Sequence, residues 1–437
     1  MLKINTWKNL SKIEQIKLLD RPIQTNDAGL KSRVQDIIKG VRIGGDMALK
    51  NLTLQYDGVR LDDIQVGNDE FASAYKQIKN STYQAIMRAM QQISIFHNKR
   101  KPIDIQIETS PGIVCATQTK PIRRAGLYVP NGSAPLVSTV LMLGIPAQIA
   151  NCSIRVLCSP PTKTGTIDPH ILVAADLCGI DKVYKVGGAQ AIAAMAYGTE
   201  TIPKVDKIFG PGNSFVTQAK MLVAQDVMGA VYDMPAGPSE VMVIADHNAN
   251  PKFIAADLLS QAEHGGDSQA ILICTDIIVS NKVNQEIKRQ IERLPRRLIA
   301  EQALKNSCLI LVDTAMEAIS IANEYAAEHL ILQIKQPRSY LPAITCAGSI
   351  FLGPWSPEST GDYASGTNHV LPTYGFAKVL SGLSVGDFMK TTTIQELTKK
   401  GLGSIAETVK ELARVEGLEA HRNAIDVRIT GGYKNAK

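Results

Sequence analysis

Short apolar segments alternate with helical stretches between about residues 115 and 280, and this alternation constrains the fold more than any other feature. The segments are almost continuously hydrophobic, as strands buried on both faces of a sheet are. Strands that alternate with helices form βαβ units, which build a parallel sheet with helices on both sides. The predicted strands are Ile154–Cys158, Lys182–Val186, Lys207–Phe209, Val241–Ala245 and Ala270–Cys274.

Different sequence flanks this region. Residues 1 to about 110 are polar and mainly helical in period, and the last 55 or so are helical and charged, with a strand candidate only at Ile425–Ile429. The predicted fold class is therefore α/β, with two doubly wound, incomplete Rossmann-like parallel-sheet domains and helical N- and C-terminal extensions.

Composition excludes several classes of protein. The chain has 437 residues, 45% hydrophobic and 20% charged, so it can bury large cores and is not disordered from end to end. The length suggests about three domain-sized units, or two larger ones with extensions. The net charge of +6 is mild, and the densest basic clusters, Lys99-Arg100-Lys101 and Arg296-Arg297, carry no interleaved aromatic residues. We expect solvated surface there rather than a nucleic-acid site.

The sequence predicts no membrane or export segment. The N-terminus lacks the apolar region of a signal peptide, and polar residues and a proline interrupt the most apolar stretch, residues 134–150. The seven cysteines are scattered, never form a CxxC motif and lie mostly in apolar runs. We expect reduced, buried thiols in a cytoplasmic protein.

One helix can be placed from its ends. Asn250 is a good N-cap, Pro251 suits the first helical position, and Gly265-Gly266 ends the run. Gln261 and His264 are three residues apart and share a face in its last turn, where the dipole favours a cation. An imidazole and an amide oxygen suit zinc, although from this pair alone a histidine that caps the last carbonyls of the helix is the favoured interpretation.

Two further stretches combine a carboxylate with an imidazole. Glu328 and His329 are adjacent, and such a pair can serve two different protons, as a reaction with two deprotonations needs; an exposed pair is the alternative. Residues 358–372 have almost no hydrophobic periodicity and combine glycines and small hydroxyl residues with the ligand-type candidates Asp362 and His369. A polar surface turn is the alternative there.

Three weaker patterns complete the set. Glu416 and His421 are five residues apart, which also suits a solvated helical arm. The glycine-rich turns Gly187–Gln190 and Phe209–Asn213 each follow a predicted strand and precede a helix, where a nucleotide sits in a doubly wound sheet. Neither turn has the full dinucleotide fingerprint.

Together these motifs resemble the histidinol dehydrogenase family. At Asn131 we expect glycine, but asparagine tolerates positive φ and can keep the turn. An earlier segment, GGDMALKNLTLQYDGV, resembles the family's N-terminal region, so the likeness covers nearly the whole chain. In chain order the matching segments are GLYVPNGSAPLVSTVLM, KVGGAQAIAAMAYGT, KIFGPGNSFVTQAK, DMPAGPSEV, LLSQAEHGGDSQAIL, NEYAAEHL, STGDYASGTNHVLPT and EGLEAHRNAI.

The resemblance implies an enzyme that oxidises L-histidinol to L-histidine through the aldehyde, with two NAD+ and one zinc per site. It implies a homodimer whose C-terminal arms reach into the partner. The implied zinc ligands are Gln261, His264, Asp362 and His421, which also contact substrate. The implied acid/base pair is Glu328 and His329, the latter also a substrate contact. Further implied substrate contacts are Ser239, His369 and Glu416, and the implied nucleotide contacts are Tyr128, Gln190 and Asn213.

The resemblance and the motifs also suggest a mechanism. His329 would take the hydroxyl proton as hydride leaves, and Glu328 would then deprotonate a water that attacks the aldehyde. A cysteine nucleophile is the alternative, but no cysteine has a histidine or a helix N-terminus next to it in sequence. A zinc hydrolase, a relative that oxidises another polar alcohol, and a basic nucleic-acid-binding protein are rival interpretations of the chain.

We expect the following boundaries. Residues 1–25 form an N-terminal helical arm, and 26–127 with 237–380 form a first α/β domain that carries the zinc and catalytic residues. Residues 128–236 form a second α/β domain on the NAD side. Residues 381–437 form a C-terminal helical arm that is exchanged between subunits.

Overall fold

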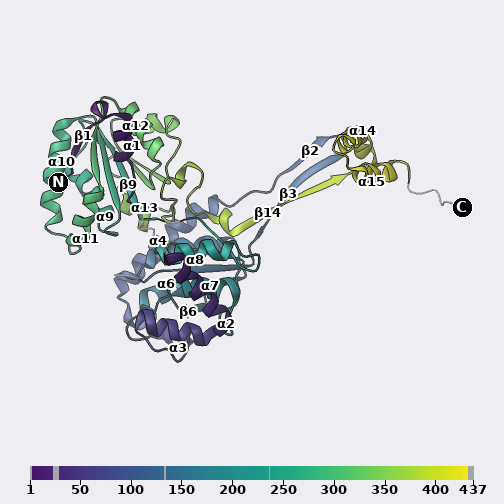
Figure 1. Ribbon diagram of the computed structural model, residues 1–437, viewed down its shortest axis with the longest axis horizontal. Helices are drawn as coiled ribbons and strands as arrows, with labels where there is room; N and C mark the ends of the chain where they lie inside the picture. Colours follow the sequence, from purple (N-terminus) through teal and green to yellow (C-terminus); the bar gives the residue numbers. More distant parts are fainter. Residues whose placement is uncertain (1, 23–28, 132–133, 236, 432–437) are drawn as a thin grey trace. The chain divides into compact units, whose positions relative to one another are not determined.

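The computed structural model of the chain describes residues 2–22, 29–131, 134–235 and 237–431 (Figure 1). The chain divides into two compact units. The larger unit comprises Met1–Arg100 and Ile122–Phe388, and the smaller unit comprises Lys101–Pro121 and Met389–Lys437.

A six-stranded parallel sheet forms one half of the larger unit. All its neighbouring strands pair in parallel. Its central strands are buried along their whole length, which explains their continuous hydrophobicity. From edge to edge the strands are β1 (Ile4–Thr6), β11 (Cys308–Leu311), β10 (Gln269–Cys274), β9 (Glu240–Ala245), β12 (His329–Gln333) and β13 (Ser349–Leu352).

Helices cover both faces of this sheet. Alternate residues of β9 enter two separate cores, with Val241 and Val243 on one side and Met242 and Ile244 on the other. The first core is closed by α9 (Pro251–Ala262), α10 (Ile277–Ile291) and α11 (Arg297–Ala303). The second is closed by α1 (Lys12–Leu18), α12 (Ala315–Tyr325) and the 3-10 helix η3 (Pro337–Ala343).

A five-stranded parallel sheet forms the other half of the larger unit. Its strands in order are β6 (Lys182–Lys185), β5 (Ile154–Ser159), β4 (Arg124–Tyr128), β7 (Lys207–Phe209) and β8 (Val231–Tyr232). Its own connections supply α5 (Val137–Ile149), α6 (Pro169–Leu177), α7 (Gly188–Tyr197) and α8 (Ser214–Ala224). Two doubly wound parallel sheets confirm the predicted fold class, and all five predicted strands are present.

Three N-terminal helices pack on this second half. α2 (Leu30–Asp57) lies against α7 and α8, α3 (Asn68–Gln77) against α6, and α4 (Asn80–Lys99) against α5. The predicted boundaries placed these residues, as part of 26–127, with the other sheet. The difference arises because the apolar face of α2, including Val34 and Val41, is buried in the core of the five-stranded sheet. The predicted helical arm, residues 1–25, also contains β1, which is an edge strand of the six-stranded sheet. Residues 23–25 lie outside the described part.

The smaller unit is a three-stranded antiparallel sheet with two helices. Strand β3 (Ile113–Pro121) lies between β2 (Gln106–Ser110) and β14 (Met389–Leu397), and α14 (Lys399–Val415) and α15 (Glu419–Ile429) follow. We predicted that residues 381–437 form a helical C-terminal arm, and this prediction is wrong in two respects. The arm contains β14, and the strand predicted at Ile425–Ile429 is the end of α15; residues 432–437 lie outside the described part.

Two other expectations can be compared with the structure. None of the described helices has both the length and the apolar content that crossing a bilayer requires. All seven cysteines are free, and five of them are buried.

Candidate active site and metal centre

The candidate site lies between the two sheets of the larger unit. Glu240, His329 and Ser349 are the first residues of three parallel strands, so they share the amino edge of the six-stranded sheet. Gly210 and Asp233 follow strands of the five-stranded sheet and therefore lie at its carboxyl edge. One cavity of about 190 Å³ is lined from both edges.

This cavity collects most of the predicted catalytic and substrate residues. Gly210 and Pro211 line it from the five-stranded sheet, and no cysteine of the described residues lines it. Six predicted residues face it: Ser239, His264, Glu328, His329, Asp362 and His369.

Glu328 and His329 are positioned by the backbone of one residue. The Glu240 N–H donates to Glu328 Oε2 at 2.9 Å, and the Glu240 carbonyl oxygen lies 3.2 Å from His329 Nδ1. A carbonyl only accepts, so this contact places the proton of neutral His329 on Nδ1 and leaves Nε2 as the basic nitrogen. Nε2 lies 3.7 Å from Asp362 Oδ1.

Both side chains are almost fully buried, which changes their proton affinity. Burial raises the pKa of Glu328 well above its ordinary value, and burial lowers the pKa of His329 to about 4. The Glu240 side chain is fixed in turn by Arg21, whose Nε and Nη2 donate to its two oxygens at 2.5 and 3.0 Å. Nothing in the local sequence marked Arg21 or Glu240, because their role depends on contacts over more than 200 residues of chain.

Helix α9 carries Gln261 as predicted, but the prediction that His264 lies in its last turn is wrong. The Asn250 side chain accepts from Lys252 N at 3.0 Å and Pro251 is the first helical residue, so the predicted start is confirmed. Gln261 is fully buried, and neither its Oε1 nor its Nε2 has a partner among the described residues. His264 lies two residues beyond the helix, which ends at Ala262.

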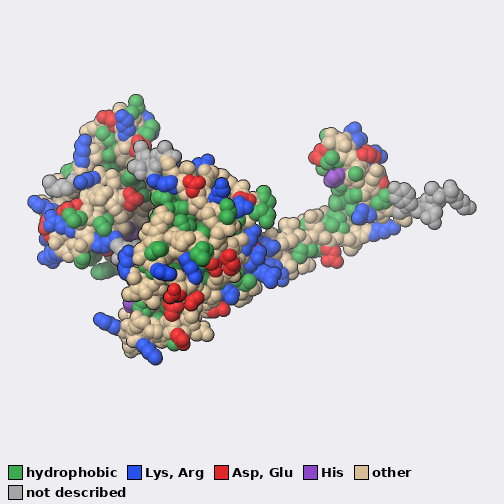
Figure 2. All heavy atoms as spheres, turned by 60° about the horizontal axis from the view of Figure 1, so that its bottom comes forward, with side chains coloured by type: hydrophobic (Ala, Val, Ile, Leu, Met, Phe, Trp, Pro, Cys, Tyr) green, Lys and Arg blue, Asp and Glu red, His purple; other side chains and the backbone are tan. Residues whose placement is uncertain are grey.

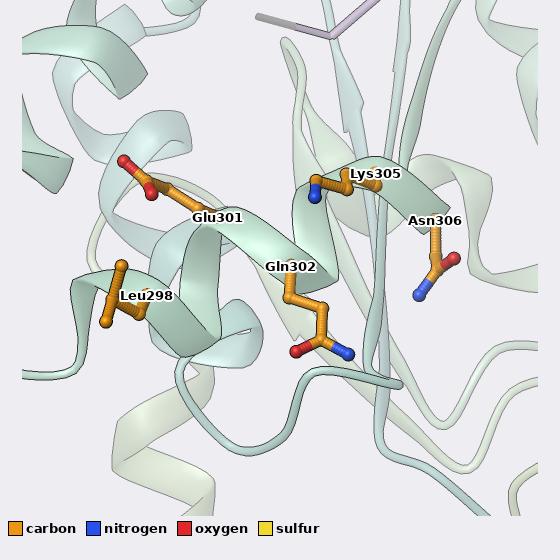
Figure 3. Close-up of a pocket in the computed structure, with 5 residues that line it drawn as sticks. All are labelled: Leu298, Glu301, Gln302, Lys305 and Asn306. Carbon is orange, nitrogen blue, oxygen red and sulfur yellow. The ribbon is translucent and has the colours of Figure 1, made fainter.

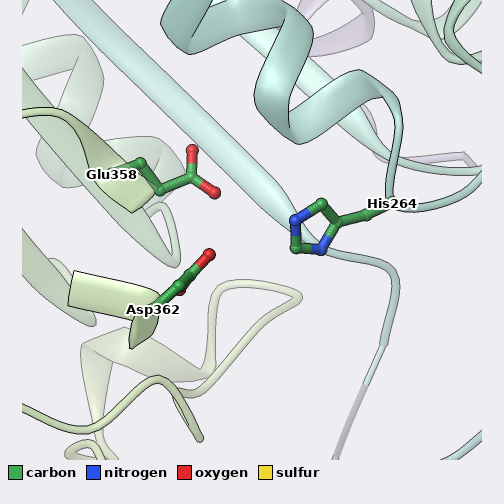
Figure 4. A group of neighbouring side chains, drawn as sticks. All are labelled: His264, Glu358 and Asp362. Carbon is green, nitrogen blue, oxygen red and sulfur yellow. The ribbon is translucent and has the colours of Figure 1, made fainter. Parts of the chain in front are cut away.

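Three side chains form a group that suits a metal ion. Ligand atoms of His264, Glu358 and Asp362 all lie within 4.8 Å of one another, and in Figure 4 the two carboxylates and the imidazole point toward one another. Glu358 and Asp362 come from the short helix α13 (Glu358–Tyr363), four residues apart and hence on one face. Glu358 is 1% exposed, and neither of its oxygens has a partner in the part of the chain that the structure describes.

The unpaired side-chain oxygens of Gln261 and Glu358 show whether these residues fit a cation. Buried amide and carboxylate oxygens without partners are costly in a folded protein, and a divalent cation is a partner that satisfies both. The donor set of nitrogen and oxygen atoms is one that zinc accepts. The residues present therefore fit a zinc ion. Glu358 was missed by the sequence analysis, although its spacing from Asp362 was a signal.

His369 is held beside this group. Its Nδ1 lies 2.9 Å from the carbonyl oxygen of Asp362, and its Nε2 lies 3.3 Å from the Thr139 hydroxyl. Burial lowers the pKa of His369. Thr139 is on α5, so this imidazole links the 358–372 loop to a helix of the other sheet.

A second cavity gathers the three predicted nucleotide contacts. It has a volume of about 410 Å³, and Tyr128, Gln190 and Asn213 all line it. The Tyr128 hydroxyl accepts from Gly188 N at 3.0 Å, and Asn213 caps α8 by accepting from Val216 N at 3.1 Å. Both glycine turns follow a strand and open a helix, as predicted. Helix α2 adds lining residues that the sequence did not point to, Ile37, Tyr56 and Asp57.

Gly210 shows why its turn needs glycine. Its φ is +118°, and a Cβ there would lie 2.1 Å from the Tyr128 carbonyl oxygen. Lys220 Nζ contacts the Gly210 carbonyl and Asp233 Oδ1, and Asp233 Oδ2 accepts from Gly210 N at 2.7 Å. Asn131, by contrast, has no positive φ; its side chain donates to the Pro160 carbonyl at 3.4 Å.

Two predicted residues belong to the smaller unit. Glu416 is the C-cap residue that follows α14, His421 lies in α15, and both are exposed. The structure thus brings Gln261, His264 and Asp362 into one region of the larger unit, whereas Glu416 and His421 belong to the other unit.

Another hollow carries no comparable chemistry. Figure 3 shows its five lining residues on α11 and the 3-10 helix η2 (Leu304–Asn306). They are Leu298, Glu301, Gln302, Lys305 and Asn306, around a volume of about 510 Å³. With one acidic, one basic and no imidazole side chain among these five, this surface offers no acid/base pair and no metal group.

Known proteins resemble the chain over almost its whole length. Residues 20–429 match the family model of histidinol dehydrogenase. The chain is 52% identical over 423 residues to histidinol dehydrogenase from Vibrio vulnificus, covering 97% of both chains. It is 53% identical over 428 residues to the enzyme from Photobacterium profundum, covering 98% of this chain and 96% of the relative. A crystal structure of histidinol dehydrogenase from Elizabethkingia anophelis matches with a TM-score of 0.95 at 47% identity, covering 98% of each chain.

These matches agree with the resemblance found in the sequence motifs. They extend over both sheets and the smaller unit, so they concern the whole architecture and not one motif. The chain therefore belongs to the histidinol dehydrogenase family, which makes it an oxidoreductase of histidine biosynthesis.

Proposed function

We propose that the chain oxidises L-histidinol to L-histidine through L-histidinaldehyde, with zinc in the site and two NAD+ consumed. The observation that carries this proposal is the placement of Glu328 and His329. Both are held by the backbone of Glu240 and both face the cavity that His264 and Asp362 also line. A base next to a metal group and a nucleotide cavity is the arrangement that alcohol oxidation by hydride transfer needs.

His329 is the base of the first oxidation. Its Nδ1 proton is engaged by the Glu240 carbonyl, so Nε2 is available for the proton of the substrate hydroxyl as hydride leaves the carbinol carbon. The low pKa of His329 keeps the imidazole neutral at physiological pH.

Glu328 is the base of the second oxidation. It deprotonates a water that attacks the aldehyde, and the resulting hydrate gives up the second hydride. Burial raises the pKa of Glu328 toward the range in which a carboxylate accepts a proton efficiently. A cysteine route has little support, because no cysteine lines the cavity within the described residues and burial raises the pKa of Cys152 to about 11.

Gln261, His264, Asp362 and His421 of a second copy would hold the zinc. Two imidazoles, one carboxylate and one amide leave the ion a formal charge of about +1, which still accepts neutral nitrogen ligands such as those of histidinol. When bound, zinc supplies an electrophilic centre that orients the substrate. Ser239, His369 and Glu416 add polar contacts to the substrate.

Tyr128, Gln190 and Asn213 would contact NAD. Their cavity lies beside the amino ends of α7 and α8, where free N–H groups and the helix dipole favour a pyrophosphate. The aromatic ring of Phe215 and the carboxylate of Asp57 in the same cavity suit an adenosine moiety.

The protein would act as a cytoplasmic homodimer whose smaller units are exchanged. The smaller unit exposes apolar side chains that a second copy would cover, and hydrophobic side chains are visible on its surface in Figure 2. The exposed apolar side chains of the smaller unit include Ile103, Ile105, Ile107, Leu412, Val415 and Leu418. On the face of the larger unit drawn in Figure 2, acidic and basic side chains are interspersed, which suits a small-molecule enzyme better than a nucleic-acid-binding protein.

The reaction is tested by absorbance at 340 nm with L-histidinol and NAD+. We expect two NADH per histidinol, and Glu328→Gln should stop the second oxidation more than the first. Full aldehyde oxidation by Glu328→Gln together with its loss in a Cys→Ser variant would overturn the mechanism. No NADH from histidinol, but NADH from another alcohol, would reassign the substrate.

The exchanged arm is tested by mixing two inactive variants. His264→Asn and His421→Asn each remove one proposed ligand. A mixed dimer regains one complete site only if His421 acts on the other subunit, because the intact His264 and the intact His421 then meet. Activity restored after co-refolding supports exchange, whereas two variants that stay inactive in the mixture contradict it.

A further inference from the structure

We propose that the Glu358 carboxylate is a further protein ligand of the divalent cation, beside His264 and Asp362. This inference rests on the zinc site of the proposed function, which did not include Glu358. It concerns a residue that the motif analysis passed over and that the geometry places in the metal group.

The spacing of the three residues matches a common ion. Zn–N and Zn–O distances of about 2.0–2.2 Å allow two ligand atoms to lie up to about 4.4 Å apart. The ligand atoms of His264, Glu358 and Asp362 all lie within 4.8 Å of one another, so small side-chain movements bring all three within coordination distance of one ion. Figure 4 shows the Glu358 carboxylate pointing between the other two side chains and not away from them.

Burial without a partner gives an independent argument. Glu358 is 1% exposed, and both of its oxygens are buried without a hydrogen-bond donor among the described residues. Its one ion-pair distance within that part of the chain is 3.9 Å to His329 Nδ1, whose proton already engages the Glu240 carbonyl. A buried carboxyl group without a partner is either protonated or bound to a cation. No lysine or arginine lies within ion-pair distance of Glu358 in the described part of the chain, so a bound metal ion is the cation that would stabilise its charged form.

The local fold explains how Glu358 reaches this position. Pro357 precedes α13, and Glu358 and Asp362 lie four residues apart on the face that packs against α9. The end of α9 carries Gln261 and is followed by His264. Added to the ligands of the proposed function, the second carboxylate would lower the formal charge of the site from about +1 to about zero, which favours retention of the ion inside a buried site.

The competing role is purely structural. Glu358 also lies beside His329, so it could be a buried acid that only packs there. The two roles differ in what a conservative replacement does: a ligand must keep a carboxylate, whereas a packing residue needs only its shape and a satisfied polar group.

The test measures zinc affinity of the full-length protein. The metal is removed with a chelator, and zinc is titrated back in competition with a chromophoric chelator. Glu358→Gln should weaken zinc binding by at least about tenfold. Glu358→Asp, which keeps the charge on a shorter side chain, should lose less. Glu263→Gln removes the same charge next to His264, outside the metal group, and should leave the affinity unchanged.

Asp362→Asn separates failure of this inference from failure of the proposed site. If Asp362→Asn weakens zinc binding and Glu358→Gln does not, the inference is overturned and the zinc site stands. If neither substitution changes the affinity, both are overturned. A larger loss in Glu358→Asp than in the isosteric Glu358→Gln would assign the effect to packing and overturn the ligand role.

Two further readouts do not depend on turnover. Replacement of zinc by Co(II) gives visible bands that follow the ligand set, so Glu358→Gln should change the spectrum and Glu263→Gln should not. The metal-free protein should melt no lower with Glu358→Gln, because the substitution removes an unpaired buried charge. Its metal-induced rise in Tm should shrink. An unchanged Co(II) spectrum would overturn the proposal.

Discussion

Acid should destabilise the larger unit through His97. This residue lies near the end of α4, its side chain is fully buried, and neither ring nitrogen has a hydrogen-bond partner among the described residues. Burial, and to a smaller extent the charge of Arg100, lower the pKa of His97 from 6.5 to about 4. Helix α4 also packs against the 358–372 segment of the candidate site. Gly366 approaches this helix so closely that a Cβ at position 366 would lie 3.0 Å from the Gln92 carbonyl oxygen.

The sign and size follow from proton linkage. Above about pH 6.5 the imidazole is neutral in both states and adds no pH dependence. Below that pH the unfolded chain binds a proton that the folded chain refuses, so stability falls until about pH 4, where the folded state also binds it. A pKa difference from 6.5 to about 4 is worth at most about 3 kcal/mol, of which about 2 kcal/mol is lost by pH 5.

The assay compares urea unfolding of wild type and His97→Leu at several pH values. Leucine has a similar volume and no titrating group, so the free energy of unfolding of the variant relative to wild type should rise by about 2 kcal/mol between about pH 7.5 and pH 5. The pH dependence contributed by all other titrating groups is the same in both proteins, so it cancels in this difference in the free energy of unfolding. A relative stability that stays constant to within about 0.5 kcal/mol over this range would refute the reasoning.

Three further outcomes are expected. Lys220→Met leaves Asp233 buried without its ion pair, so urea unfolding should show a loss of about 3–5 kcal/mol and the KM for NAD+ should rise; an Asp233→Asn second substitution should restore most of the stability. Arg21→Met leaves Glu240 buried without its ion pair, so the free energy of unfolding should fall by about 3–5 kcal/mol and kcat should fall. A fall in the free energy of unfolding of less than about 1 kcal/mol would contradict the role of this pair. Chelator treatment should abolish NADH formation, and zinc, but not magnesium, should restore it.

The strands and helix α9 could be predicted because their signals are local. Buried parallel strands are continuously apolar, and α9 has its N-cap, its proline and its terminal glycines within its own sequence. The motif residues at the two sheet edges followed from the same local patterns and the family resemblance. Six of them meet in one cavity, although their roles remain predictions.

Other features depend on contacts that no local pattern records. The segment before His329 has helical composition, yet Ala326 adopts a left-handed conformation at φ 57°, ends α12 and lets β12 begin at His329. Helix α2 packs on the five-stranded sheet because its apolar face fits the surfaces of α7 and α8, which lie more than 100 residues away in the chain. The spacing of Glu358 from Asp362 can be read in the sequence, but only the folded chain shows that Glu358 is buried without a partner among the described residues.

The pairing of β14 with β3 has a consequence for how the smaller unit can be dissected. Every residue of β14, from Met389 to Leu397, has a partner on β3, so a chain shortened at Phe388 would leave a bare row of N–H and C=O groups along a nine-residue strand. Such an open edge recruits other chains and promotes aggregation. Loss of zinc from a shortened protein would therefore not identify His421 as a ligand, and single side-chain substitutions in an otherwise intact smaller unit are the informative changes.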